Sequence, residues 1–178
     1  MASRLIEKQV LYTGKKIRLE IHRLEGEDGQ RFEKEIIVHP GAVVILPFAD
    51  ADTIVLIRNR RYAVGQILVE LPAGTLDKSE SPMNAAGREL MEETGLVAGR
   101  LKPLLNFFAS PGIMSEKMYV FAAYDLRKGT KALEPGEEIE VFPAKLTDAI
   151  TMIRTGEIQD GKTIATLLAY DRFYRNPQ

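Results

Sequence analysis

Three glutamates at helical spacing are the residues of this sequence best suited to chemistry. Glu89, Glu92 and Glu93 stand at positions i, i+3 and i+4, so a helix places them within about 100° of arc on one face. Like charges at this spacing repel by roughly 0.2–0.5 kcal/mol per pair, and a bound divalent cation would offset the repulsion. The sequence has no cysteine and only two histidines, His22 and His39. An oxygen-preferring ion, Mg²⁺ or Mn²⁺, therefore suits the cluster better than zinc.

The helix that would carry these glutamates has clear start and stop signals. Ser81 followed by Pro82 predicts its beginning, because serine caps helix N-termini and proline suits the first turn. Gly95 predicts its end, since glycine readily adopts the left-handed conformation that follows a helix. The residues expected to pack inward are Met83, Ala86 and Leu90. A solvated acidic face on an ordinary amphipathic helix is the alternative interpretation.

The surrounding residues follow a fixed pattern. The chain reads Gly74, five residues, Glu80, seven residues, then Arg88-Glu89-Leu90-x-Glu92-Glu93-x-Gly95-Leu96. Every fixed position matches the Nudix box, GX5EX7REUXEEXGU with U apolar, and such agreement would arise by chance in roughly 10⁻⁵ or fewer chains of this length. The sequence therefore resembles the Nudix hydrolase family. The resemblance implies an α+β fold, a Nudix-type α/β/α sandwich with a mixed β-sheet, and Mg²⁺-dependent cleavage of a nucleoside diphosphate linked to another group.

The resemblance also implies a metal site. Glu89 and Glu93 would hold the ion, and Glu92 would share it directly or through water, which makes Glu92 a catalytic candidate as well. The main-chain carbonyl of Ala73, just before the box, would be a further ligand.

Other residues of the box have structural roles in the family. Arg88 would orient a box glutamate such as Glu80, and Gly74 and Gly95 are fixed backbone positions. A surface arginine is the alternative for Arg88.

A proline after the box points to a substrate. Pro111 lies 15 residues past Leu96, and a proline near this spacing resembles the marker of ADP-ribose pyrophosphatases, which yield AMP and ribose 5-phosphate. Enzymes for GDP-mannose, UDP-glucose or dinucleoside polyphosphates share much of the pattern. A non-catalytic ligand sensor on the same fold is the alternative of another class.

A diphosphate requires cations that do not titrate, and arginine supplies them with fork geometry. By resemblance to the family's R-x-x-R-Y segment, Arg61 is the first candidate for a phosphate contact and Arg58 the second. Glu70 is expected to help line the pocket, and Glu116 to contact substrate or metal. A solvated strand end is the alternative for the arginines.

Hydrolysis also requires a base for the attacking water. The resemblance points to a late loop, here Leu133–Val141, in which Glu137 is the best candidate and Glu138 the next. Plain solvent-facing charge is the alternative for this loop.

The elements that must position these residues are mostly strands. Alternating apolar residues in Lys16–Arg23 and Arg31–Val38, around the turn signal Asp28-Gly29, predict an antiparallel hairpin. We expect residues 1–40 to form an N-terminal β extension and residues 41–178 the hydrolase domain. The strands expected in that domain are Ala42–Pro47, Thr53–Ile57, Ile67–Leu71, Leu101–Phe108, Lys117–Tyr124 and Ile139–Phe142, and its last two helices are Thr147–Arg154 and Thr163–Phe173.

The overall composition is that of an ordinary folded domain. The 178 residues carry a formal charge of −1, which gives no sign of a nucleic-acid or anionic-membrane binder. The N-terminus lacks a signal-peptide pattern, and the longest apolar run is too short to span a bilayer. We expect a cytoplasmic enzyme for a small nucleotide sugar. The resemblance and the β extension together predict a homodimer, in which each extension packs on the partner and helps to form its substrate pocket.

Overall fold

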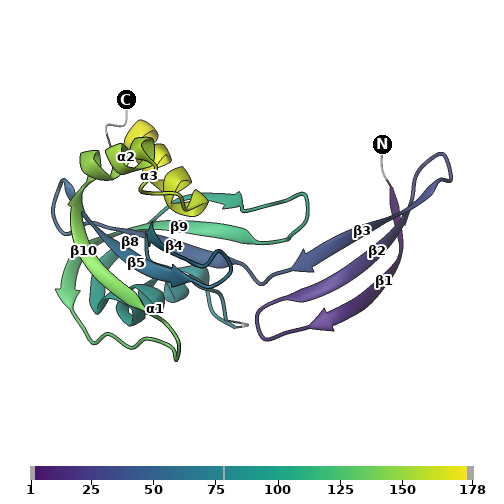
Figure 1. Cartoon of the computed structure of the whole chain (residues 1–178), viewed down its shortest axis with the longest axis horizontal. Coiled ribbons are helices and arrows are strands. Elements are labelled where there is room, and N and C mark those ends of the chain that lie inside the picture. The colour runs from purple at the N-terminus through teal and green to yellow at the C-terminus, as the bar shows by residue number, and fades with distance from the viewer. Residues whose placement is uncertain (1–2, 78, 176–178) are drawn as a thin grey trace.

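The computed structural model describes residues 3–77 and 79–175 (Figure 1). In chain order the elements are β1 (Arg4–Thr13), β2 (Arg18–Glu25), β3 (Arg31–Val38), β4 (Ala42–Pro47), β5 (Thr53–Arg61), β6 (Gln66–Glu70), β7 (Ala73–Thr75), α1 (Pro82–Thr94), β8 (Leu96–Phe108), β9 (Lys117–Lys128), β10 (Ile139–Lys145), α2 (Leu146–Thr155) and α3 (Gly161–Phe173). No helix in this part of the chain is both long and apolar enough to cross a membrane.

The first three strands form an antiparallel sheet in the order β1-β2-β3. This sheet projects from the rest of the molecule (Figure 1). The predicted hairpin of β2 and β3 is confirmed, and Gly29 in its turn has a φ of 76°. Strand β1 was not predicted as a separate element, because it is exposed along its whole length and has no buried face to impose alternation.

A four-stranded mixed sheet lies at the centre of the remaining chain. Its order is β7-β4-β9-β8, with β4 parallel to β9 and antiparallel to β7. The whole of β4 is buried, as its continuous apolar run predicted. Helix α1 packs on one face of this sheet, against Val43 and Ile45 of β4. The opposite face of β4, with Val44 and Leu46, belongs to the larger core cluster.

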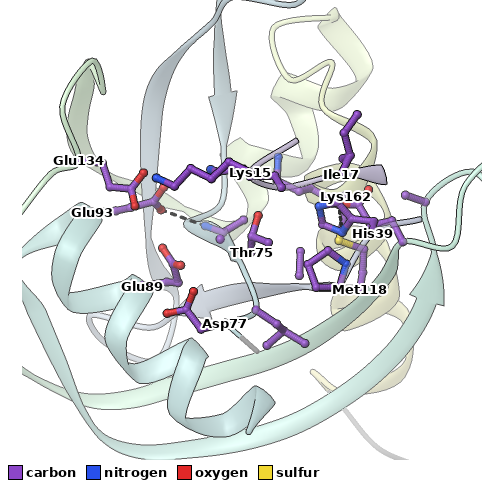
Figure 2. A pocket seen from close by; sticks show the side chains of 18 of the residues that line it. Lys15, Ile17, His39, Thr75, Asp77, Glu89, Glu93, Met118, Glu134 and Lys162 are labelled. Atoms are coloured by element: carbon purple, nitrogen blue, oxygen red, sulfur yellow. Dashed lines mark hydrogen bonds and ion pairs between the residues drawn. The ribbon is translucent and has the colours of Figure 1, made fainter. Parts of the chain in front are cut away.

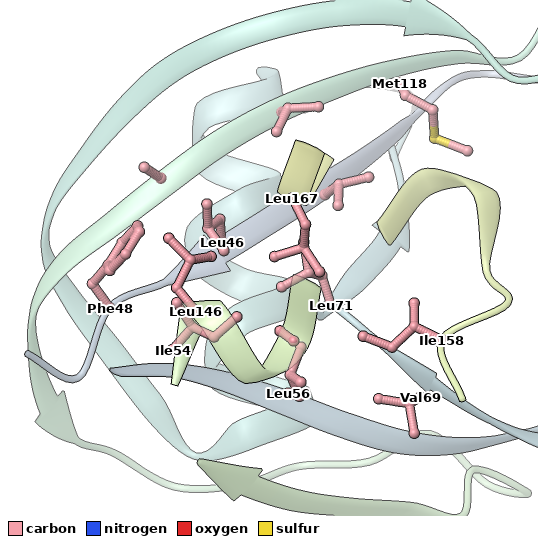
Figure 3. Packing of buried hydrophobic residues seen from close by; sticks show 14 of the residues in the cluster. Leu46, Phe48, Ile54, Leu56, Val69, Leu71, Met118, Leu146, Ile158 and Leu167 are labelled. Atoms are coloured by element: carbon pink, nitrogen blue, oxygen red, sulfur yellow. The ribbon is translucent and has the colours of Figure 1, made fainter. Parts of the chain in front are cut away.

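That larger cluster joins the mixed sheet to a second, antiparallel sheet of order β10-β5-β6 and to helices α2 and α3. Figure 3 shows the residues that meet there, which include Leu46, Ile54, Leu56, Val69, Leu146 and Leu167. The mixed sheet therefore has helix α1 on one face and α2 and α3 on the other. The expected α+β sandwich, with helices on both faces of a mixed β-sheet, is confirmed.

Several strands are longer than the sequence predicted. Strand β8 begins at Leu96, directly after the cap of α1, and β9 runs to Lys128. The reason is that the two strands pair as a long hairpin from Leu96↔Lys128 to Phe108↔Lys117, so backbone pairing continues where the side chains are too polar to indicate a strand. The short strand β7 was not among the expected strands, and it forms because its backbone pairs with β4.

Candidate active site

Helix α1 is fixed at both ends by the residues that predicted it. The Ser81 side chain accepts a hydrogen bond from the backbone N–H of Asn84, and Pro82 is the first helical residue. Gly95 adopts the left-handed conformation with φ of 71°, and its N–H donates to the carbonyl of Met91. The predicted bounds of the helix are confirmed.

The buried face of α1 differs from the prediction at one residue. Ala85, Ala86 and Leu90 are fully buried, whereas Met83 is 45% exposed. The expectation that Met83 packs inward is wrong. Two alanines face β4 instead, and their small side chains allow the helix to lie close to the sheet.

The three glutamates lie at different depths. Glu93 is 3% exposed, and the side chains of Glu89 and Glu92 are 14% and 29% exposed. The backbone N–H of Ala73 donates to Glu93 Oε2 at 2.9 Å, so β7 lies directly against the acidic face of the helix. A Cβ at Gly74 would be only 1.9 Å from the carboxyl carbon of Glu89. A side chain at position 74 would therefore displace the Glu89 carboxylate from its present position.

Arg88 supplies positive charge within the cluster. Its guanidinium donates to Glu80 at 2.9 Å and to both Glu89 and Glu92 at 2.8 Å. These carboxylates raise the pKa of Arg88, with Glu80 the largest contributor. Arg88 therefore offsets much of the repulsion on the helix, and it joins the loop before the helix, through Glu80, to the acidic face.

Burial makes the two deeper carboxylates reluctant to ionise. Burial raises the pKa of Glu93 to about 8, with the negative charges of Glu89 and Glu137 adding to the effect. Burial likewise raises the pKa of Glu89. A cation placed against these groups would favour their charged forms.

The donor set fits a hard divalent ion. The groups are carboxylate oxygens, and the Gly74 backbone leaves a space that a side chain would fill. Among the residues that the structure describes, no three acidic, histidine or cysteine side chains already form a complete ligand cluster. One nitrogen of Arg88 instead contacts Glu89 and Glu92 together.

The acidic face opens into a cavity of about 1180 Å³. Figure 2 shows Glu89, Glu93 and Glu134 at one end, and Ile17, His39 and Met118 at the other. The turn between β1 and β2, including Lys15, also lines it. The N-terminal sheet thus contributes to the same cavity as the helix.

Arg61 lines this cavity and is held from behind by a buried carboxylate. Arg61 Nε donates to Glu70 Oε1 at 2.8 Å, and Lys162 Nζ is 2.6 Å from Glu70 Oε2. Glu70 is completely buried and lies beneath these two cations, so its place is behind the pocket wall. Lys162 also contacts Asp160 at 2.9 Å, and both residues line the cavity at the start of α3.

Arg58 lies away from the cavity. It pairs with Glu140 at 3.2 Å and stacks over the Phe142 ring at 4.1 Å. Successive residues of a strand point to opposite faces, and Arg58 and Arg61 are three positions apart on β5. The structure therefore brings only Arg61 of this pair into the site.

The two candidate bases, Glu137 and Glu138, also differ in their position relative to the cavity. Glu137 lines the cavity and contributes to the raised pKa of Glu93. Glu138 pairs with Arg60 at 2.9 Å and does not line it. The geometry favours Glu137.

Glu116 and Pro111 lie toward the other end of the cavity. Glu116 is among the lining residues, and its Oε1 is 3.5 Å from His39 Nδ1. Pro111 does not line the cavity. Its loop instead bonds to β3, where Ile37 donates to the Ile113 carbonyl and accepts from the Ser115 N–H, both at 2.9 Å.

Sequence reasoning did not single out several lining residues, namely Lys15, Asn59, Glu134, Asp160 and Lys162. Period-two alternation could have indicated Asn59, which stands two positions before Arg61 on β5. The others come from a turn, a loop and a distant helix, and no local pattern links them to the box.

Comparisons with known proteins identify the family and the relatives of this chain. The family model for the NUDIX domain matches residues 38–167. An "ADP-ribose pyrophosphatase" of Bacillus subtilis (strain 168) is 35% identical, covering 92% of this chain and 89% of the relative. A "Methanol dehydrogenase activator" of Bacillus methanolicus is 32% identical, covering 89% and 87%. A "GDP-mannose pyrophosphatase" of Citrobacter koseri is 38% identical over 71% of each chain.

A solved structure supports the fold. The chain titled "Crystal structure of ADP compounds hydrolase" has a TM-score of 0.86 and 24% identity, and the similarity covers 96% of this chain and 93% of that one.

Proposed function

Because the chain belongs to the NUDIX family of hydrolases, we propose that it cleaves the diphosphate of ADP-ribose in a Mg²⁺-dependent reaction that gives AMP and ribose 5-phosphate. The observation that carries this proposal is that partly buried Glu89, buried Glu93 and Arg61, which Glu70 holds in place, all line one cavity. The similarity to the Bacillus subtilis relative extends over nearly the whole of both chains, which supports ADP-ribose as the substrate.

In this proposal Glu89, Glu92 and Glu93 would hold the metal, and the Ala73 carbonyl would be a further ligand. When bound, the ion neutralises charge on the phosphate oxygens. Arg61 binds the diphosphate through its fork, which Glu70 fixes in orientation.

The proton of the attacking water passes to Glu137. Water attacks one phosphorus, and the bond from that phosphorus to the bridging oxygen breaks. Glu137 suits the base role because it lines the cavity, whereas Glu138 is engaged by Arg60 outside it.

GDP-mannose is the second candidate substrate, because a relative named for that activity is 38% identical to this chain. The two are separated by measuring kcat/KM for ADP-ribose, GDP-mannose and UDP-glucose under identical conditions. A higher kcat/KM for GDP-mannose would replace ADP-ribose in the proposal and leave the reaction type unchanged.

The direct test is to incubate the protein with ADP-ribose and Mg²⁺ and to separate the products chromatographically. We expect AMP and ribose 5-phosphate in equal amounts, and no turnover in EDTA. Failure to form AMP between neutral and alkaline pH would reject ADP-ribose as the substrate. Undiminished turnover in EDTA would reject the metal.

We further propose that residues 1–40 form a dimerisation element and residues 41–178 the hydrolase domain. Strand β1 is an edge strand with exposed apolar side chains, which are Leu5, Ile6, Val10, Leu11 and Tyr12. Such an edge favours pairing with another chain, here a second copy whose cavity the extension would help to complete. Light scattering that shows a monomer at micromolar concentration would reject the dimer. The cytoplasmic location stays a prediction from the sequence.

A further inference from the structure

The geometry points to Asn59 as a substrate-binding residue. Its side-chain amide would donate a hydrogen bond to a phosphate oxygen of the nucleoside diphosphate sugar, beside Arg61. This inference rests on the proposed function and adds to it an uncharged donor that neither the box nor its flanking patterns contain.

The strand places Asn59 and Arg61 together. Both belong to β5 and are two positions apart, so their side chains share one face of the strand. Both line the cavity. The residues between and before them, Arg60 and Arg58, are paired with Glu138 and Glu140 outside it. The strand therefore presents two polar side chains to the cavity and two to the exterior.

The side chain of Asn59 has no hydrogen-bond partner among the described residues of the protein. The side chain belongs to a residue that is only 6% exposed, and no hydrogen bond joins its amide to any of residues 3–77 or 79–175. The amide atoms are not among the fully buried polar atoms that lack a partner, so they keep their accessible surface where Asn59 lines the cavity. A ligand that enters the cavity could supply the missing partner.

Other buried polar side chains make the contrast clear. The carboxylates of Glu20, Glu70 and Glu93 and the hydroxyl of Thr163 all form hydrogen bonds. The hydroxyl of Thr166 forms none, but Thr166 does not line the cavity. Within the described residues, Asn59 therefore combines deep burial, an amide without a partner and access to the cavity.

The neighbours of Asn59 indicate which ligand group it would meet. It pairs across β5 and β10 with Ile139, which follows the segment that carries Glu137. On its own strand it is followed at two positions by Arg61. Asn59 thus lines the same cavity as the proposed phosphate-binding cation, Arg61, and the proposed base, Glu137. An amide N–H suits an anionic oxygen there because it donates without requiring an ion pair.

The test replaces Asn59 with leucine, which has a similar branched shape and no polar atoms. Loss of a hydrogen bond to a charged group should lower kcat/KM for ADP-ribose by roughly 10–100-fold. Affinity for the non-hydrolysable α,β-methylene analogue of ADP-ribose should fall as well. The melting temperature should stay the same or rise, since the side-chain amide makes no hydrogen bond within the described part of the protein.

Thr166→Val is the matched control. It removes the other buried polar group without a partner, at a position away from the cavity. It should likewise preserve or raise the melting temperature, and kcat/KM should be unchanged.

Three outcomes would overturn the inference. If Asn59→Leu keeps kcat/KM within about twofold of wild type, Asn59 does not bind substrate, while the proposed function stands. If the variant loses activity together with a melting temperature several degrees lower, Asn59 is structural. If the wild-type protein cleaves neither ADP-ribose nor GDP-mannose, the proposed function falls and this inference falls with it.

Discussion

Replacing Glu93 with glutamine should remove activity and, at the same time, stabilise the metal-free protein at alkaline pH. Glu93 is almost fully buried on α1, where burial and the neighbouring carboxylates of Glu89 and Glu137 raise its pKa to about 8. Arg61 and the N–H of Ala73 oppose this rise without cancelling it. An ionised Glu93 therefore costs folding free energy whenever no cation accompanies it.

The size and sign of the effect follow from the two pKa values. The difference between about 8 in the folded state and 4.5 in an ordinary glutamate corresponds to at most about 4–5 kcal/mol. Below the lower value the carboxyl is protonated in both states, and no penalty applies. Between pH 4.5 and about pH 8 the folded state keeps a proton that the unfolded state has lost. The free energy of unfolding therefore decreases as pH rises through this range, and the full penalty is reached above about pH 8.

Glutamine removes this penalty but retains an oxygen that can accept from Ala73. Its buried NH₂ group lacks an assured partner, which costs about 1–3 kcal/mol. We therefore expect a net gain of about 1–3 kcal/mol near pH 8 without metal, or roughly 3–10 °C in melting temperature. Near pH 5 the gain should vanish or reverse.

The assay is thermal unfolding of the wild type and Glu93→Gln in EDTA across this pH range. Glu140→Gln is the control, because it removes an exposed carboxylate that pairs with Arg58. Added Mg²⁺ should raise the melting temperature of the wild type more than that of the variant. A Glu93→Gln destabilisation of the same size at every pH would refute the reasoning, because it would show that the carboxylate is stabilising rather than strained. Full hydrolytic activity in the variant would refute the metal assignment.

Two further substitutions test the arrangement of the site. Glu137→Gln should lower kcat by roughly 10²–10⁴-fold. Glu138→Gln should change kcat little, because Glu138 is outside the cavity. Steady-state kinetics in which both variants lose equal activity would contradict the choice of base. Gly74→Ala should displace the Glu89 carboxylate, since the new Cβ would be 1.9 Å from it, and should weaken Mg²⁺ binding by roughly tenfold or more in calorimetry. Gly112→Ala, with no atom within 4 Å of its Cβ, serves as the control, and equal Mg²⁺ affinities in the two variants would count against the close contact at Gly74.

Local signals predicted the helix of the site well. Ser81, Pro82 and Gly95 fixed the bounds of α1 because caps act through neighbouring backbone groups. The sequence predicted the buried face of this helix less accurately. Met83 is apolar and at a plausible spacing, but the helix meets β4 through Ala85 and Ala86. Which face of a helix is buried depends on the sheet that it packs against, and the sequence of the helix alone does not identify that sheet.

Strand faces posed a similar difficulty. Alternation along β5 is visible in the sequence, but it does not say which of Arg58 and Arg61 faces the cavity. The pairing of β5 with β10 decides the matter, because it gives Arg58 a partner in Glu140 outside the site. The contact between Glu70 and Lys162 joins residues 92 positions apart, so only the folded chain could reveal it.

Glu93 and Asn59 together indicate a functional site more specifically than a run of like charges on a helix does. Charge on a helix is usually solvated, and on α1 the partly exposed Glu92 is paired with Arg88, one turn earlier. Glu93 and Asn59 are different, because each is largely buried and each lines the same cavity. Glu93 adds to an excess of negative charge, and the side-chain amide of Asn59 has an unmet hydrogen bond within the described residues. A cation would relieve the first and a phosphate oxygen the second, so a metal-bound diphosphate satisfies both requirements at once.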